Sequence, residues 1–536
     1  MTNTNNKILS ITNLKKYFPV AKSSIFQKNQ LYVRANEDIT LDIYEGETLG
    51  IVGESGCGKS TLGRVLLQLY PQTAGTTMYY GTKLDDMTPS YVEDTLRHLD
   101  KYQARYKRAA EKAAQLNAKV EEVGEDNADF YLLQNRNLAR CDEQTCLQHI
   151  VKIIGGFFVE STNEGRELLL KAYHVNSKRN AMVGEMRTLQ MEADHLQTLE
   201  SGKSVEKTKK RLAQYEQKQK HLAEEIAKID AEVRKANDAL NALRAKCAGK
   251  GEFDRYEAMR DEGVDLSRLK YSEMRLLRRD LQIIFQDPYS SLNPRLTIGQ
   301  IIEEGLVTHN FFKHGSEQMR QYIVNTMVKC GLQEYMLHRY PHQFSGGQRQ
   351  RVAIARALAV QPKFVVCDEC VSALDVSIQS QIINLLQDLK EKEHLTYMFI
   401  SHDLSVVRYI SDRICVMYLG NVVELASAKT VFDDPRHPYT VALLSSIPTT
   451  DVDVASKERI ILEGNIPSPI KPPSGCKFHT RCYMACEKCK RVPPELREIE
   501  PDHFVACHFP EKKLDENGNY LFKLPKMERR ATRDKK

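Results

Sequence analysis

A glycine-rich loop between an apolar segment and a helix-forming segment limits most strongly what this chain can fold into. The apolar segment, Thr48 to Val52, runs into Gly53-Glu54-Ser55-Gly56-Cys57-Gly58-Lys59-Ser60-Thr61, and the helix-forming residues Leu62 to Leu69 follow. The loop matches the pattern GxxxxGK[ST], whose glycines allow backbone N–H groups to surround phosphate oxygens at a helix N-terminus. We therefore expect a strand, a phosphate loop and a helix, with Lys59 at the β- and γ-phosphates and the Ser60 hydroxyl on Mg²⁺.

A second apolar segment ends in two carboxylates. Phe364 to Cys367 is followed directly by Asp368 and Glu369. Transfer of a phosphoryl group to water requires a carboxylate that holds Mg²⁺ and a group that polarises the attacking water. The pattern predicts the first role for Asp368 and the second for Glu369.

Two further features accompany these carboxylates. The run Phe344-Ser345-Gly346-Gly347-Gln348 opens a predicted helix from Arg349 to Ala359, which gives a second glycine-rich helix start suited to phosphate. His402 follows the apolar segment Tyr397 to Ile400. Histidine in this place indicates a role beside phosphate chemistry more strongly than a place in the core.

The motifs, in this order, resemble those of the ABC ATPases. The resemblance adds Gln286, in Phe285-Gln286-Asp287-Pro288, and the loop Ser372-Ala373-Leu374-Asp375. It implies an α/β fold with a RecA-like core, an antiparallel β subdomain and a helical subdomain. It also implies ATP and Mg²⁺ as cofactors, with Gln286, Glu369 and His402 as catalytic residues and with Ser60, Gln286 and Asp368 as the residues that bind Mg²⁺. In that family two ATPase subunits pair head to tail, so Ser345 to Gln348 of one subunit would contact ATP bound by the other.

The same resemblance raises two local questions. Phe18 fits the aromatic residue that stacks on adenine, with the adjacent Tyr17 as the alternative. The family usually has proline after the glutamate that polarises water, whereas this chain has Cys370. The substitution puts the rigidity of the backbone in doubt but leaves the carboxylate chemistry intact, so we expect an active site that hydrolyses ATP.

Blocks outside the general motifs resemble the ATPases of oligopeptide, dipeptide and nickel importers. They include the segment from Gln286 to Arg295, the segment from Val371 to Gln379, and the C-terminal sequences His437-Pro438-Tyr439-Thr440 and Pro467-Ser468-Pro469. The resemblance implies an ATP-hydrolysing subunit at the cytoplasmic face of the cell membrane that energises peptide uptake. It implies as partners a related ATPase subunit, two membrane-spanning permeases and, indirectly, an extracytoplasmic peptide-binding protein. Nickel complexes and other small solutes stay open as cargo.

Cysteines gather near the C-terminal end. Cys476, Cys482, Cys489 and Cys507 resemble a cluster that holds a [4Fe–4S] centre in some of these importer ATPases. Four thiolates also suit tetrahedral Zn²⁺, and unmetallated thiols stay possible. Cys486, His479, His503 and His508 offer alternative ligands, so spacing does not decide the metal.

A long segment interrupts the ATPase motifs. We expect a discontinuous nucleotide-binding domain at 1–88 and 272–430, a helical, coiled-coil-like insertion at 89–271 and a C-terminal extension at 431–536. Apolar residues repeat at spacings of three and four over 212–243 and over 102–120, which predicts two helices paired in an antiparallel hairpin. The longer helix should run from about Lys203 to Lys246, and Ile150 to Val159 fits a strand and turn of a small cap. We interpret this insertion as an arm for an unknown protein partner.

Composition narrows the function classes. No apolar run approaches the roughly 18 residues that cross a bilayer, and Met1 to Asn13 lack the apolar core of a signal peptide. A net charge of +6 on 536 residues gives no reason to expect nucleic acid as a partner. The alternatives are a chromosome or DNA-repair ATPase of the SMC type and a translation-associated ABC protein, which would use the arm. The position of the insertion before Gln286 and the presence of a single ATPase motif set argue against them.

Overall fold

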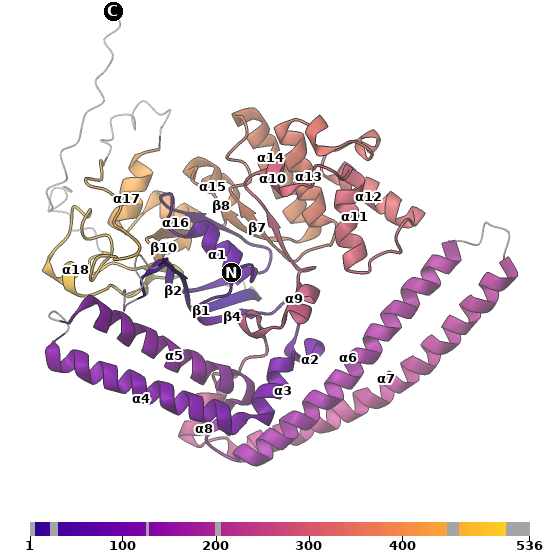
Figure 1. Cartoon of the computed structure of the whole chain (residues 1–536), viewed down its shortest axis with the longest axis horizontal. Helices are drawn as coiled ribbons and strands as arrows, with labels where there is room; N and C mark the ends of the chain where they lie inside the picture. The colour runs from indigo at the N-terminus through magenta and orange to yellow at the C-terminus, as the bar shows by residue number, and fades with distance from the viewer. Residues whose placement is uncertain (1–5, 22–29, 125–127, 199–204, 448–459, 511–536) are drawn as a thin grey trace, which may run out of the picture.

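The computed structural model describes residues 6–21, 30–124, 128–198, 205–447 and 460–510 (Figure 1). Within these ranges, no helix combines the length and the hydropathy that crossing a bilayer requires.

An eight-stranded sheet forms the centre of the ATPase domain. Its strand order is β11-β12-β10-β9-β3-β8-β7-β6, and the five strands from β9 to β6 run parallel. The strands are β3 (Thr48–Val52), β6 (Leu281–Ile284), β7 (Phe364–Asp368), β8 (Thr396–Ile400), β9 (Arg413–Tyr418), β10 (Asn421–Ser427), β11 (Arg497–Glu500) and β12 (His503–Val505). Because β3, β8 and β7 are neighbours and parallel, the motifs that follow them emerge at one edge of the sheet.

A smaller antiparallel sheet covers the phosphate-loop helix α1 (Lys59–Leu66). Its strand order is β2-β1-β4-β5, made by β1 (Lys7–Pro19), β2 (Tyr32–Tyr44), β4 (Ala74–Tyr79) and β5 (Val264–Asp265). The apolar side chains of β1 and β2 join those of α1 and β3 in one buried cluster. This cluster fixes α1, and with it the phosphate loop, between the two sheets.

Helices between β6 and β8 form a second unit. It contains α10 (Pro288–Ser291), α11 (Ile298–Thr308), α12 (Glu317–Lys329), α13 (Gly346–Leu358) and α14 (Val376–Glu393), whereas α9 (Tyr271–Leu277) precedes β6. Helix α13 packs against α10, α11, α12 and α14. After β8 come α15 (Leu404–Ile410), α16 (Ala428–Asp433), α17 (Pro438–Ser445) and α18 (Glu487–Arg491). The α/β core, antiparallel sheet and helical unit are those that the sequence predicts.

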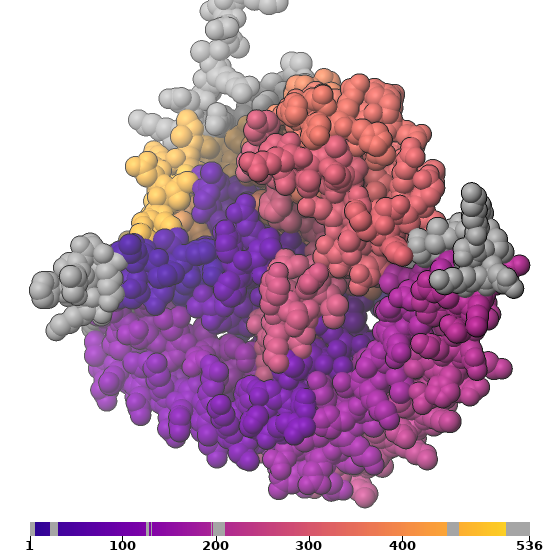
Figure 2. Space-filling view, turned by 45° about the vertical axis from the view of Figure 1, so that its right-hand side comes forward, coloured from indigo at the N-terminus to yellow at the C-terminus, as the bar shows by residue number. Residues whose placement is uncertain are grey.

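The chain between β4 and β5 forms two long antiparallel helix pairs. It contains α2 (Leu84–Met87), α3 (Ser90–Arg97), α4 (Leu99–Val123), α5 (Phe130–Ile154), η1 (Gly155–Phe158), α6 (Thr162–Thr198), α7 (Val205–Cys247) and α8 (Gly251–Glu257), and η2 (Leu266–Arg268) follows β5. Helix α4 packs along α5, and α6 packs along α7. The two pairs diverge from a shared base near α3 and α8 (Figure 1). In the space-filling view the insertion, coloured purple to magenta, runs along the lower side of the molecule (Figure 2). The predicted long helix is present as α7, although Lys203 lies outside the described residues.

The predicted pairing of the two apolar series is wrong. The series over 102–120 lies on α4 and the series over 212–243 lies on α7, but each helix takes its chain neighbour as partner. Short connections favour antiparallel packing of consecutive helices, so α4 packs along α5 and α6 packs along α7. A coiled-coil twist of either pair stays a prediction.

The predicted strand at Ile150 to Val159 is also wrong. Residues 150–154 form the end of α5 and residues 155–158 form the short helix η1, which Val159 follows. Side chains from Ile150, Ile154 and Phe157 face the buried cluster at the base of the insertion, where the Phe157 and Phe253 rings lie 5.8 Å apart. A short apolar run is compatible with either a buried helix or a buried strand. Here packing against the buried cluster favours the helix.

Helix α5 attaches the insertion to the antiparallel sheet. The backbone N–H of Gly75 donates to the Thr145 hydroxyl at 3.2 Å, and the Lys152 ammonium donates to the Thr76 hydroxyl at 3.2 Å. His149 lies in the same interface, where the Arg268 guanidinium donates to its backbone carbonyl at 2.8 Å. Burial, followed by the nearby Arg268, Arg105 and Lys152, lowers the pKa of His149 to about 3.

Acid should therefore weaken this attachment. Because the pKa of His149 is about 3 in the folded chain and about 6.5 unfolded, the unfolded chain binds more protons, and stability is lost as pH falls from about 6.5. Between pH 7 and 5 the wild-type chain should lose about 1–2 kcal/mol more stability than His149→Gln. Urea unfolding followed by circular dichroism at both pH values measures this difference. Equal losses in the two proteins would show that His149 does not titrate on unfolding.

Candidate active site

The phosphate loop has the geometry that its glycines predict. It connects β3 to α1, and Gly53 and Gly58 adopt φ values of 151° and 100°. A Cβ atom on Gly58 would lie 2.0 Å from the carbonyl oxygen of Ala35, so no larger residue fits. The Lys59 side chain is buried under the loop, and its ammonium donates to the carbonyl oxygens of Gly53 at 2.9 Å and Glu54 at 3.1 Å. The loop thus fixes a cation at its centre, the position that bound phosphates need.

A hydrogen bond joins the loop to β7. The Ser60 hydroxyl donates to Asp368 Oδ1 at 2.5 Å, and the Arg64 guanidinium donates to Oδ2 at 3.3 Å. Asp368 is 1% exposed at the end of β7. A hydroxyl and a carboxylate are the hard oxygen ligands that Mg²⁺ prefers. Two of the three residues that the sequence predicts for the metal, Ser60 and Asp368, are therefore brought together, and they fit Mg²⁺. The Gln286 side chain donates to Glu369 instead, so its contact with the metal stays a prediction.

Arg64 belongs to none of the motifs that the sequence predicts for the site. It lies one helical turn after Ser60 on α1, so its side chain and the Ser60 hydroxyl reach the same carboxylate. The spacing of four residues was the available signal.

Glu369 lies beside the two other predicted catalytic side chains. The Gln286 side-chain amide donates to Glu369 Oε2 at 2.8 Å, and His402 Nδ1 lies 3.6 Å from the same oxygen. Gln286 follows β6, Glu369 follows β7 and His402 follows β8, so the parallel sheet brings three distant residues to one edge. This cluster can hold a water molecule between a carboxylate and two polar groups that orient it.

The backbone at Glu369 is held by its neighbours. Glu369 has a φ of 49°, its N–H donates to the Ile400 carbonyl at 3.0 Å, and the Ser372 hydroxyl donates to its carbonyl at 2.8 Å. Cys370 is 2% exposed and packs in the core. Hydrogen bonds on both sides of the peptide thus restrain the backbone without the usual proline.

The second glycine-rich segment begins α13, as predicted. Ser345 and Gln348 form a reciprocal capping box, in which each side chain accepts a hydrogen bond from the other's backbone N–H. Ser345 and Gly346 are exposed, whereas Gly347 is buried against α14. A Cβ atom on Gly347 would lie 2.4 Å from a methyl group of Ile378, which explains the glycine at this position.

Phe18 and Tyr17 have different surroundings. Tyr17 is 6% exposed, and its hydroxyl donates to the Glu37 carboxylate. Phe18 is half-buried, packs edge-on against Tyr70 at 5.5 Å and carries the Lys16 ammonium 4.6 Å from its ring centre. Since Tyr17 is buried and hydrogen-bonded in the interior, Phe18 is the better placed of the two aromatic residues to stack on an adenine ring.

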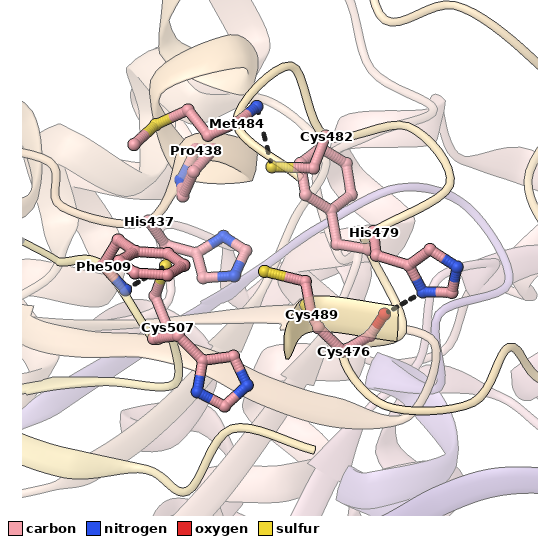
Figure 3. Close-up of a pocket in the computed structure, with 11 residues that line it drawn as sticks. His437, Pro438, Cys476, His479, Cys482, Met484, Cys489, Cys507 and Phe509 are labelled. Atoms are coloured by element: carbon pink, nitrogen blue, oxygen red, sulfur yellow. Dashed lines mark hydrogen bonds between the residues drawn. The ribbon is translucent and has the colours of Figure 1, made fainter. Parts of the chain in front are cut away.

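The four predicted ligand cysteines surround one small cavity (Figure 3). Cys476, Cys482, Cys489 and Cys507 line it, together with His437, His479 and His508. Cys486 is not in the lining, although its sulfur lies 3.8 Å from that of Cys489, and His503 pairs instead with Glu424 at 2.8 Å. The thiols match a four-thiolate site in kind and number.

The side chains around this cavity do not form a closed metal site as they stand. Across the part of the chain that the structure describes, no set of three or more His, Cys, Asp or Glu side chains is arranged so that it could hold a metal ion. Burial raises the pKa of Cys482 to about 12 and that of Cys507 to about 11. A metal would therefore have to displace protons from these buried thiols.

Comparison with known proteins decides the family. A family model described as "ABC transporter" matches residues 36–256 and 255–372. The chain belongs to the ABC transporter family. A second model, "Oligopeptide/dipeptide transporter, C-terminal region", matches residues 423–489 of this ABC protein. As an ABC ATPase, the chain binds and hydrolyses ATP with Mg²⁺.

Individual relatives agree with this assignment. The chain is 51% identical over 249 residues to the oligopeptide transport ATP-binding protein AppF of Bacillus subtilis. The aligned residues cover 46% of this chain and 75% of the relative. It is 51% identical over 246 residues to OppF of Salmonella typhimurium, another oligopeptide transport ATP-binding protein, over 46% of this chain and 73% of the relative. A solved dimer of the ATP-binding cassette MJ0796 with ADP and Pi aligns at 18% identity and a TM-score of 0.40, over 78% of this chain and 98% of that one. A TM-score this low adds nothing to the family match.

Removal of the Glu369 carboxylate should stop hydrolysis while ATP binding persists. Glu369→Gln keeps the side-chain size and a polar contact for Gln286 but removes the base, so kcat should fall by a factor of about 100 or more. Phosphate release and binding of a fluorescent ATP analogue measure the two steps. The same substitution at the exposed Glu391 on α14 is the control and should leave both unchanged. A Glu369→Gln variant with near-normal turnover would remove Glu369 from the chemistry.

Proposed function

We propose that this ABC ATPase energises an importer of oligopeptides or dipeptides. The observation that carries the proposal is the match of residues 423–489 to the C-terminal region of oligopeptide/dipeptide transporters. Relatives named for oligopeptide transport support it. The grouping of Gln286, Glu369 and His402 supplies the hydrolysis that uptake against a gradient requires.

The partners follow from this role. A related ATPase subunit would pair head to tail with this chain, so that each α13 start meets ATP on the other phosphate loop. The exposed Ser345 and Gly346 suit such a contact. Two permeases would anchor the pair at the cytoplasmic face of the membrane, and an extracytoplasmic binding protein would deliver the peptide. We also propose that Phe18 stacks on the adenine ring of ATP.

The division of the chain is part of the proposal. Residues 1–88 and 272–430 form the nucleotide-binding domain, 89–271 the insertion and 431–536 the extension. The insertion is proposed as an arm for a protein partner, because α6 and α7 extend away from the sheets (Figure 1). The comparisons do not favour the SMC-type or translation-associated alternatives, in which the arm would be the main functional element.

A [4Fe–4S] cluster at the four lining cysteines is proposed, with Zn²⁺ as the alternative. Its support is the presence of four thiols around one cavity. Thiolates are soft ligands that suit either group, and a structural role fits a site lined by apolar and aromatic side chains.

Metal analysis tests this centre. Full-length protein purified without oxygen should carry iron and acid-labile sulfide, and replacement of Cys476, Cys482, Cys489 and Cys507 by serine should remove both. Cys486→Ser is the control and should keep them, because Cys486 does not line the cavity. Zinc in place of iron would select the alternative, and the absence of any metal would contradict the proposed centre.

Stimulation of hydrolysis by peptide tests the importer role. The ATPase is reconstituted in lipid with its permeases and partner subunit, and ATP hydrolysis is measured with empty and with peptide-loaded binding protein. Loaded binding protein should raise the rate several-fold, and the Glu369→Gln variant should abolish the rise. Hydrolysis that responds to neither permeases nor peptide would contradict import, while stimulation by DNA or ribosomes would favour the alternatives.

A further inference from the structure

The C-terminal extension contacts the phosphate loop through Arg481. The two terminal nitrogens of its guanidinium donate to the two carboxylate oxygens of Glu54 at 2.7 and 3.0 Å. The Arg481 side chain is 7% exposed and that of Glu54 24%. Two parallel, charge-assisted hydrogen bonds in a shielded place are the geometry in which arginine fixes a carboxylate most firmly.

Tyr439 makes a second contact with the same loop residue. Its hydroxyl accepts a hydrogen bond from the backbone N–H of Glu54 at 2.8 Å. The Tyr439 ring is fully buried, with ring centres of Tyr418 and Phe478 4.8 and 5.3 Å away. Because this aromatic packing fixes the hydroxyl, both the main chain and the side chain of Glu54 are held by residues far along the chain.

Lys477 supports the loop from another side. Its ammonium donates to the backbone carbonyl of Leu419 at 3.1 Å and to the side chain of Asn421. Between them, the backbone N–H of Gly420 donates to the Cys57 carbonyl at 3.0 Å. The segment 477–481 thus reaches the phosphate loop directly at Glu54 and indirectly through the turn between β9 and β10.

The charge of Glu54 makes these contacts relevant to nucleotide binding. Glu54 directly follows Gly53 in the loop that receives the phosphates, so an uncompensated carboxylate there would repel the phosphate charge. The Arg481 guanidinium cancels that charge and directs the carboxylate toward the extension. From the segment 477–481 the sequence offered only His479, as an alternative metal ligand, and it gave no signal for Arg481.

We propose that Arg481 is a positioning residue of the ATP site, which neutralises Glu54 and holds the phosphate loop in its binding conformation. The C-terminal extension is then a working part of the ATPase rather than an appendage. This inference rests on the ATPase activity alone, so it stands or falls independently of peptide import.

Steady-state hydrolysis by the full-length chain tests it. Arg481→Met should raise the KM for ATP roughly tenfold, which corresponds to about 1.4 kcal/mol, and should leave kcat within about twofold because Glu369, Gln286 and His402 are untouched. Arg481→Lys keeps the positive charge but not the two parallel hydrogen bonds of the guanidinium. Its KM for ATP should lie within about threefold of the wild-type value. The control is Arg436→Met, which breaks ion pairs with Asp434 and Glu500 elsewhere in the extension and should not change KM.

A second background separates charge compensation from general support of the fold. In Glu54→Gln protein no carboxylate needs neutralising, so Arg481→Met should there raise KM by less than about threefold. Thermal unfolding accompanies each measurement, and Arg481→Gln replaces Arg481→Met in both backgrounds if the latter does not fold. An equal rise of KM in both backgrounds, or a KM unchanged by loss of Arg481, would overturn the proposal.

Discussion

The hydrogen bond between Ser60 and Asp368 is the contact on which the site depends. It joins the end of the phosphate loop to the end of β7 across 308 residues of sequence. The contact forms because β3 and β7 lie on either side of β8 in a parallel sheet, which places their carboxyl ends at the same edge of the sheet. The other predicted catalytic residues lie at the same sheet edge, with Gln286 after β6, Glu369 after β7 and His402 after β8.

The topology also explains how the domain tolerates its insertion. The insertion leaves the ATPase domain after β4 and returns at β5, and these strands pair antiparallel, with Tyr79 opposite Val264. Its two ends therefore meet at adjacent positions on the smaller sheet, away from the motif edge. The entropic cost of closing a loop grows only slowly with its length, so a long insertion at such a point need not disturb the core.

Prediction from sequence succeeded where local chemistry determines structure. The phosphate loop, the carboxylates after β7 and the start of α13 each carry glycine, capping or apolar patterns that act within a few residues. Prediction failed where tertiary partners decide. The pairing of α4 with α5 depends on which other helix presents an apolar face to α4 in the folded chain. The helical conformation at residues 150–158 depends on packing against Phe253. The Arg481–Glu54 pair joins residues with no shared sequence pattern, so only the fold reveals it.

The central claim is that Ser60 and Asp368 hold the catalytic metal beside bound ATP. Electron paramagnetic resonance of Mn²⁺, used in place of Mg²⁺, tests it in the full-length chain with ATP. The account predicts a bound Mn²⁺ with phosphorus hyperfine coupling in the wild type, and loss of that signal at the same concentrations in Ser60→Ala and Asp368→Asn. An unchanged, phosphate-coupled Mn²⁺ signal in both variants would contradict it.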